Sequence, residues 1–199
     1  MCAGAAAHTA GQHDVFVHPE HLQRPLCGAT RPHFFRGVAT VVAKLFNIVE
    51  PDAAVFGQKD WQQLAIIRAL VRDLDFPIEI IGGPIGREAD GLAASSRNER
   101  LTAAARRDAA CIHRGLLAAQ ARWAAGGGRD AAAGAARAAI VQGGGQVDYV
   151  EVVDPDSLES RTGSEGGAAV LAVAAFFPAE SGPAVRLLDN IQLPPAVQR

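Results

Sequence analysis

The residues of VFGQKDWQQL (55–64) offer the first candidate chemistry in this sequence, because a glycine and a Lys–Asp pair separate an apolar run from a helical pattern. Where a strand leads into a helix, the free N–H groups of the first helical turn and the helix dipole favour anions. Gly57 lets a ligand approach the backbone, and Lys59 adds a positive charge that suits a phosphate. Asp60 could cap the helix through its carboxylate. The alternative is an ordinary capped turn with a solvated lysine, since turns with these residue types are common.

A second candidate for phosphate binding is DGLAASSRN (90–98). Ser95 and Ser96 offer hydroxyl groups and Arg97 offers a bidentate guanidinium, a set that can hold phosphate oxygens as charge builds on them during phosphoryl or nucleotidyl transfer. The alternative is a serine-rich helix start with a surface arginine. Both segments would follow successive strands of one parallel sheet, at its ligand-binding edge, so together they indicate a nucleotide site.

Other polar residues give weaker signals. Gln62 and Gln63 lie in the first helical turn, where an amide could bind a hydroxy acid, but exposed helical glutamines are usually just solvated and the sequence does not separate the two cases. HPEH (18–21) has loose metal-ligand spacing without a second cluster, so we expect a surface loop there and no metal site. No Ser/His/Asp or Cys/His arrangement can be argued.

The elements that must position these residues follow from hydrophobic periodicity. Residues 37–49 have helical spacing, with an inward stripe at Val38, Val41, Val42, Leu45, Phe46 and Val49. AAVFG (53–57) suits a strand buried on both faces of a parallel sheet. A second helical pattern runs from residue 60 to residue 74, and PIEIIGGP (77–84) predicts another strand. This order is one strand–helix–strand crossover with a helix before it.

The rest of the chain has a different character. A long charged loop at 82–98 is expected to be functional or a hinge. We then predict a helix over about 101–125, a break at 126–128 and a second helix to about 141. The runs VDYVEVVD, AAVLAVAAFF and AVRLLDNIQL predict a small antiparallel sheet. Asp148, Glu151 and Asp154 are expected on its solvent face.

Composition narrows the class of protein. With 199 residues, 49% of them hydrophobic, the chain can form one full core, or a core with a small added module, in a soluble globular protein. A net charge of −2 offers no basic footprint for nucleic acid, and no stretch is apolar enough to span a membrane. Cys2, Cys27 and Cys111 form no disulfide or zinc pattern, which favours a reducing compartment. The first fourteen residues match no targeting signal, so we expect a cytoplasmic protein.

Two parallel strands do not make a stable doubly wound sheet. Residues 1–36 supply at most one further strand, DVFVHP (14–19). We therefore expect the strands at 53–56 and 78–81 to have unpaired edges and apolar faces open to water.

Four blocks in collinear order, RPHFFRGVATVVAKLFNIVEPD, VFGQKDWQQ, EADGLAASSRN and VRLLDNI, resemble the signatures of the pantothenate synthetase (pantoate–beta-alanine ligase) family. The first block resembles the plant and green-algal branch. The resemblance, which covers residues 15–193, implies an α/β fold: a Rossmann-like nucleotidyltransferase domain with a smaller α+β C-terminal lid domain, usually as a homodimer. Here it implies a partial Rossmann-like domain over 1–86, binding ATP and pantoate, and the lid over 87–199.

The resemblance also implies an activity, the condensation of (R)-pantoate with β-alanine by ATP and Mg²⁺ through pantoyl adenylate. The products are pantothenate, AMP and pyrophosphate, on the route to coenzyme A. Position by position, Gln63 matches a pantoate ligand, and Lys59, Ser95, Ser96 and Arg97 match catalytic positions. The residues matching ATP contacts are Gly57, Gln58, Lys59, Asp60, Gly86, Ala94, Ser95, Ser96 and Arg97.

Some positions depart from the family pattern. The family's first strand is followed by a His-x-Gly-His motif that binds ATP, and this sequence contains no such motif. The resemblance therefore implies that the N-terminal half of the family's nucleotide domain is absent. The alternative to an active ligase is an incomplete fragment that binds nucleotide weakly or associates with a full-length subunit. Ala94 stands where the family usually has Leu or Met, and Phe34 stands where many bacterial members have His.

Overall fold

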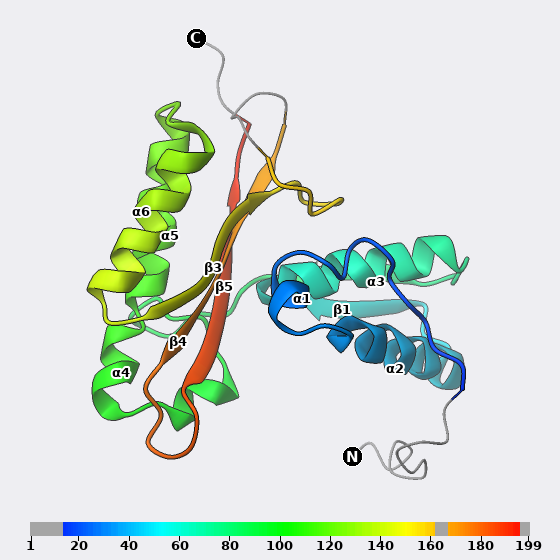
Figure 1. The fold of residues 1–199 in the computed structure, drawn as a ribbon. Coiled ribbons are helices and arrows are strands. Elements are labelled where there is room, and N and C mark those ends of the chain that lie inside the picture. The colour runs from blue at the N-terminus through cyan, green and yellow to red at the C-terminus, as the bar shows by residue number, and fades with distance from the viewer. Residues whose placement is uncertain (1–13, 162–166, 196–199) are drawn as a thin grey trace.

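The computed structural model describes residues 14–161 and 167–195, which form two lobes (Figure 1). The N-terminal lobe contains α1 (Cys27–Thr30), α2 (Phe34–Val49), β1 (Ala53–Gly57), η2 (Gln58–Asp60), α3 (Trp61–Asp73) and β2 (Glu79–Gly83). The C-terminal lobe contains η3 (Ser96–Arg100), α4 (Ala103–Asp108), α5 (Cys111–Ala124), α6 (Gly128–Gln142), β3 (Gln146–Val153), β4 (Ala169–Phe177) and β5 (Val185–Leu193). The predicted crossover and the three predicted C-terminal strands are all present.

The N-terminal lobe is a strand–helix–strand unit. β1 and β2 pair in parallel, with Val55 opposite Ile81. One face of this pair, with Phe56 and Ile80, packs against the inner sides of α2 and α3, where Phe46 and Ile67 are buried. Helix α2 ends as predicted, because the chain changes direction at Glu50 and Pro51.

The C-terminal lobe is an antiparallel sheet in the order β3–β4–β5, with α5 and α6 on one face. The two helices approach closely at Gly115, where an added Cβ would lie 3.0 Å from the Cβ of Ala139. Trp123 of α5 is fully buried and donates its indole N–H to the carbonyl oxygen of Pro194 at 2.8 Å. The other face of the sheet, including Ala172, packs against α1 and α3 of the N-terminal lobe. The sheet is thus covered on both faces.

Two predicted elements differ from the structure. The helix expected over 101–125 is split into α4 and α5, because the chain turns at Ala109 and Ala110, both of which pack into the core. DVFVHP (14–19) forms no strand. It runs beside α2 instead, where the Val17 N–H donates to Thr40 Oγ1 at 3.0 Å. Among the described residues, no helix combines the length and the hydrophobicity that crossing a bilayer requires.

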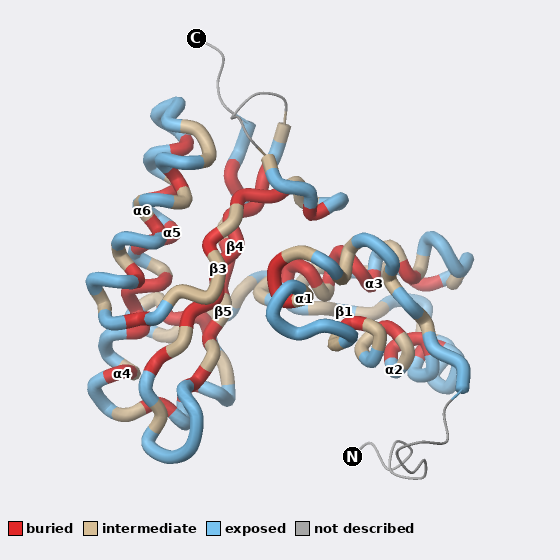
Figure 2. The backbone as a smooth tube through the Cα atoms, viewed as in Figure 1, coloured by how far each residue is buried: buried red, intermediate tan, exposed pale blue. Residues whose placement is uncertain are grey.

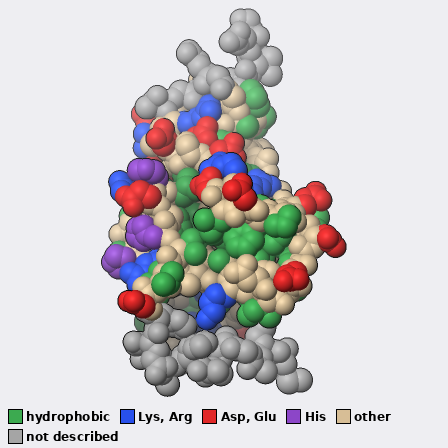
Figure 3. Space-filling model, turned by 90° about the vertical axis from the view of Figure 1, so that its right-hand side faces the viewer, with side chains coloured by type: hydrophobic (Ala, Val, Ile, Leu, Met, Phe, Trp, Pro, Cys, Tyr) green, Lys and Arg blue, Asp and Glu red, His purple; other side chains and the backbone are tan. Residues whose placement is uncertain are grey.

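One face of the parallel pair is bare. Val55 is 70% exposed and Ile81 is 42% exposed, so the prediction that 53–57 is buried on both faces is wrong, while the expected open apolar face is observed. No residue of β1 belongs to the buried class (Figure 2). The α2 stripe is also only half covered, since Val41, Leu45 and Val49 are exposed. Figure 3 shows hydrophobic side chains gathered on the outer surface of this lobe. Periodicity predicted the apolar stripe correctly but not what would cover it.

Because one face of the strand pair is bare, substitutions at an exposed and at a buried apolar residue of this lobe should differ in their effect on stability. We expect Val55→Thr to change the free energy of unfolding by about 0.5 kcal/mol or less, because its side chain is in water. Ile67→Ala removes a fully buried side chain and should cost about 3 kcal/mol. Urea unfolding of both variants measures the two values. An equal cost for Val55→Thr would mean that the face is covered in solution.

Candidate functional site

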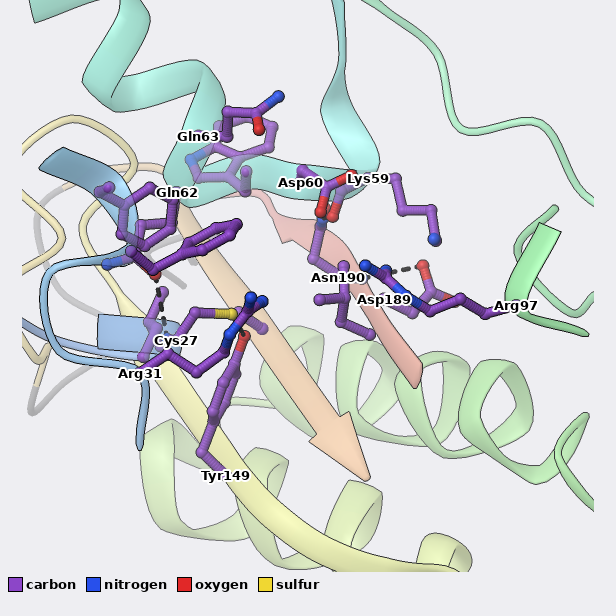
Figure 4. Close-up of a pocket in the computed structure, with 16 residues that line it drawn as sticks. Cys27, Arg31, Lys59, Asp60, Gln62, Gln63, Arg97, Tyr149, Asp189 and Asn190 are labelled. Atoms are coloured by element: carbon purple, nitrogen blue, oxygen red, sulfur yellow. Dashed lines mark hydrogen bonds between the residues drawn. The ribbon is translucent and has the colours of Figure 1, made fainter. Parts of the chain in front are cut away.

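A pocket of about 190 Å³ lies between the two lobes. Its walls come from the α1–α2 region, from η2 and the start of α3, and from β3 and β5 (Figure 4). The polar and ionisable residues that line it are Cys27, Arg31, Lys59, Asp60, Gln62, Gln63, Arg97, Tyr149, Asp189 and Asn190. Lys59 and Arg97 lie at one end of the pocket and Cys27, Arg31 and Tyr149 at the other.

The turn after β1 places two predicted residues in the pocket. Gly57 ends the strand in an extended conformation, and η2 leads directly into α3. Lys59 and Asp60 both line the pocket. Asp60 occupies the N-cap position of α3 but makes no capping hydrogen bond, so the predicted capping role is wrong. The 3-10 turn tightens the start of the helix instead, which leaves the Asp60 carboxylate available to a ligand.

The second predicted segment contributes Arg97 to the pocket. Ser95 caps η3, since its Oγ accepts a hydrogen bond from the Arg97 N–H at 3.2 Å. Ala94 is tied to Gly86 by a backbone hydrogen bond of 2.8 Å. An adjoining cavity of about 10 Å³ is lined by Lys59 and Ser95, so the two predicted segments face each other.

The pocket therefore brings together only part of the predicted set. Lys59, Asp60, Gln63 and Arg97 line it, and Ser95 borders the adjoining cavity. The predicted residues outside both are Gly57, Gln58, Gly86, Ala94 and Ser96. Their backbones shape the turns that present the others, and a ligand contact for any of them stays a prediction.

The structure separates the two glutamines that the sequence could not. Gln62 is 5% exposed; its Oε1 accepts from the Cys27 N–H at 3.0 Å, and its Nε2 donates to the carbonyl oxygens of Leu22 and Pro25. This amide is fully used in holding the segment before α1. Gln63 lines the pocket and has no side-chain hydrogen bond to another described residue, so its amide is available to a ligand.

Sequence reasoning missed the residues at the other end of the pocket. The Arg31 guanidinium lies 3.7 Å from the centre of the Phe34 ring, a cation–π contact that holds a positive charge at the pocket wall. Both residues belong to the first block of the family resemblance, so a signal for Arg31 existed. Cys27 Sγ lies 3.4 Å from Tyr149 Oη, a contact between residues 122 positions apart that no local pattern predicts.

The acidic residues of β3 are not simply solvated. The Asp148 side chain is nearly buried and accepts from Arg186 Nη2 at 2.6 Å, so the predicted solvent face is wrong there. Glu151 pairs with Arg129 at 3.2 Å. Burial raises the pKa of Tyr149 well above its ordinary value, so its hydroxyl keeps its proton at neutral pH.

The loop that presents Arg97 is held by charged groups. Arg106 of α4 forms ion pairs with both Glu88 and Asp90. Hydrogen bonds from Asn98 and Arg106 lower the pKa of Glu88, and the bond from Arg106 lowers the pKa of Asp90. Both carboxylates therefore stay ionised at neutral pH, and their ion pairs with Arg106 tie the loop to α4.

The fold and the pocket define an α/β protein in which a parallel strand–helix–strand lobe and a lobe built on an antiparallel sheet enclose a pocket lined by cationic and amide side chains. The sequence model of the pantoate-beta-alanine ligase family matches residues 5–192. The chain belongs to this family. Pantothenate synthetase from Anaeromyxobacter dehalogenans is 51% identical over 184 residues, covering 92% of this chain and 61% of that protein. Pantoate–beta-alanine ligase from Oryza sativa subsp. japonica is 49% identical over 194 residues, covering 91% and 56%.

Solved structures agree with this assignment. Pantothenate synthetase from Thermus thermophilus is 40% identical with a TM-score of 0.82, covering 92% of this chain and 64% of that one. Pantoate-beta-alanine ligase from Francisella tularensis, complexed with beta-gamma ATP and beta-alanine, is 27% identical with a TM-score of 0.65, covering 89% and 57%. The chain thus spans about three fifths of the length of these relatives. The predicted fold class, Rossmann-like with an α+β C-terminal part, is confirmed.

Because Gln62 is fully hydrogen-bonded and Gln63 is not, replacing each by alanine should change the free energy of unfolding by very different amounts. Gln62→Ala leaves one buried N–H and two carbonyl oxygens without their partner, so we expect a loss of about 3 kcal/mol in unfolding free energy. Gln63→Ala should stay within about 0.5 kcal/mol of the parent protein. Chemical denaturation of the two neighbours is the measurement. Equal losses would contradict the roles assigned to them.

The carboxylate of Asp154 should make the stability of the protein depend on pH, through the turn that supports the pocket. This turn presents the Pro155 carbonyl oxygen to the indole N–H of Trp61 at 2.9 Å. Burial raises the pKa of Asp154, but bonds from the Ser157 N–H and the Arg161 guanidinium outweigh it, and the pKa falls to about 2. A folded-state pKa below the ordinary 3.8 stabilises the fold above that pH, and this stabilisation is lost as the pH falls from 3.8 toward 2.

We therefore expect Asp154→Asn to be less stable than the parent at pH 6, with the difference shrinking as the pH falls to 3. Urea unfolding at several pH values measures this difference. The neighbouring exposed residue supplies the control, Asp156→Asn. A difference that stays constant from pH 6 to pH 3 would argue against a native carboxylate at Asp154.

Proposed function

We propose that this protein condenses (R)-pantoate with β-alanine at the expense of ATP, giving pantothenate, AMP and pyrophosphate. The observation that carries the proposal is that Lys59 and Gln63, from η2 and the start of α3, meet Arg97, from η3, in one pocket. The family resemblance assigns these positions to phosphate and pantoate. The complex of the Francisella tularensis relative with beta-gamma ATP and beta-alanine supports the choice of substrates.

The proposed chemistry needs alignment and charge neutralisation more than acid–base catalysis. A pantoate carboxylate oxygen attacks the α-phosphorus of ATP, and the bond to the pyrophosphate oxygen breaks. The β-alanine amine then attacks the acyl carbon of pantoyl adenylate, and AMP leaves. Lys59 and Arg97 would offset the charge that grows on the phosphates, while the Gln63 amide would orient the pantoate.

Several finer assignments belong to the same proposal. Mg²⁺ would accompany the nucleotide; it is usually held by phosphate oxygens, waters and one or two carboxylates, and Asp60 lines the pocket as one candidate ligand. A homodimer and a domain division after Gly86, with a C-terminal lid, follow from the resemblance. The cytoplasm is proposed because Cys27 and Cys111 are both free and buried thiols, as reducing compartments favour.

A second candidate is a chain that binds nucleotide but works only with a full-length subunit. The observation that favours it is the bare apolar face of β1 and β2, with Val55 and Ile81 open to water. Exposed faces of this kind mark interaction sites. The two candidates differ in whether the chain forms product alone.

The test is AMP formation that requires both pantoate and β-alanine. The chain has two lysines, so Lys44→Ala, at an exposed position on α2, is a matched control for Lys59→Ala. We expect Lys59→Ala to lose about 100-fold in kcat, because a charge that stabilises the transition state is removed. Lys44→Ala should retain the parent rate.

Two other outcomes would contradict the proposed activity of the chain alone. Equal AMP formation by Lys59→Ala and the parent would reject the proposed site. No product from the folded parent, with product restored by adding an inactivated full-length relative, would select the second candidate.

A further inference from the structure

Strand β5 carries two consecutive buried polar residues. The first to consider is Asn190, which is 3% exposed and donates its Nδ2 hydrogens to the carbonyl oxygens of Gln58 at 2.8 Å and Lys59 at 2.9 Å. Both carbonyls belong to η2, the turn that presents Lys59 to the pocket. A side chain of the C-terminal lobe therefore fixes the backbone of the N-terminal lobe at the residue on which the proposed function depends.

The second is Asp189, whose side chain is 1% exposed. Its carboxylate accepts from Arg87 Nη1 at 2.7 Å and Nη2 at 3.1 Å, and from the Asn190 N–H at 2.8 Å. Arg87 Nη1 also donates to the carbonyl oxygen of Gly91 at 3.0 Å. Residues 87–93 form a short hairpin, closed by the antiparallel bridge between Arg87 and Ala93, and these bonds fix that hairpin to the same strand.

Strand geometry explains how adjacent residues can hold two different segments. Successive side chains of a strand point to opposite faces of the sheet. Leu187 belongs to the core under α5 and α6, whereas Leu188 packs toward the N-terminal lobe. By the same alternation Asp189 faces the helix side and Asn190 faces η2. β5 is an edge strand, so the hairpin can reach it around the open side.

The hairpin has little freedom to take another position. Gly91 has φ of +89°, and an added Cβ would lie 2.3 Å from His113 Nδ1 on α5. The Glu88 and Asp90 pairs with Arg106 hold its other side. It is thus packed against the C-terminal lobe and tied to β5.

We propose that Asn190 and Asp189 are positioning residues of the nucleotide site. Asn190 sets the place of Lys59, and Asp189, through Arg87, sets the place of Arg97. The inference rests on the proposed function, in which both cations meet the phosphates of ATP. The spacing between the two cations is then set by neighbouring residues of one strand. Since small misplacements of a reacting group are costly, loss of either tie should weaken the site while Lys59 and Arg97 themselves are retained.

Asn190→Ala tests the first tie. Gln120→Ala is the matched control, because Gln120 Nε2 donates to a carbonyl oxygen of the same strand, that of Gln192, at 2.9 Å, away from the pocket. Hydrogen exchange over residues 53–64 without nucleotide reports the tie directly, and ATP titration reports its consequence. We expect faster exchange, about tenfold weaker ATP binding, a higher KM for ATP and an unchanged KM for β-alanine. Gln120→Ala should show none of these changes.

Arg87→Lys tests the second tie, since lysine keeps a positive charge beside Asp189 but lacks the planar fork. Arg129→Lys, which alters the single Glu151 contact at 3.2 Å, is its control. We expect faster exchange over residues 86–98 and weaker ATP binding for Arg87→Lys alone. If Asn190→Ala does not fold, Asn190→Ser removes the amide with a smaller change in polarity.

Three results would overturn the inference. Unchanged exchange over 53–64 in Asn190→Ala would show that the tie does not hold η2. Faster exchange with parental ATP affinity would show that the tie does not position Lys59. A parent protein that binds no ATP would reject the proposed function itself and with it the positioning role, and this result is seen before any variant is compared.

Discussion

The buried ion pair between Arg87 and Asp189 is the constraint on which the arrangement of the site depends. A carboxylate that is only 1% exposed has lost nearly all its water, and leaving such a charge without a partner costs about 3–5 kcal/mol. The bidentate guanidinium and the Asn190 N–H replace that water. Because Arg87 belongs to the loop that leads to Arg97, its pairing with Asp189 brings that loop to β5 and helps to place Arg97.

The start of α3 shows how the two lobes share one set of contacts. Trp61 donates to the turn after β3, and Gln62 holds the segment before α1. Together with the bonds from Asn190 to the carbonyl oxygens of η2, these contacts anchor the stretch 58–62 to three different segments, while Gln63 is left available in the pocket. A site built in this way needs few residues for binding and many for support.

Local pattern predicted the elements well and their surroundings less well. The strands at 53–57 and 185–193 follow from their apolar runs and the helix α3 follows from its periodicity, although the burial expected for 53–57 was wrong. The same rule misjudged Val41 and Leu45, since a stripe does not say what covers it. Local motifs predicted Lys59 and Arg97, and the family resemblance added Gln63; all three line the pocket. Local motifs could not predict the contact of Cys27 with Tyr149, which depends on tertiary folding.

The two tryptophans, one in each lobe, make the protein its own optical reporter. Trp123 is enclosed in the C-terminal core, whereas Trp61 is enclosed only because α3 packs against Val170 and Ala172 of the sheet. If the lobes part while each stays folded, Trp61 alone enters water and its fluorescence shifts to longer wavelength. Melting of the sheet and its helices would shift both. The emission spectrum of the unlabelled protein therefore distinguishes opening between the lobes from loss of the fold.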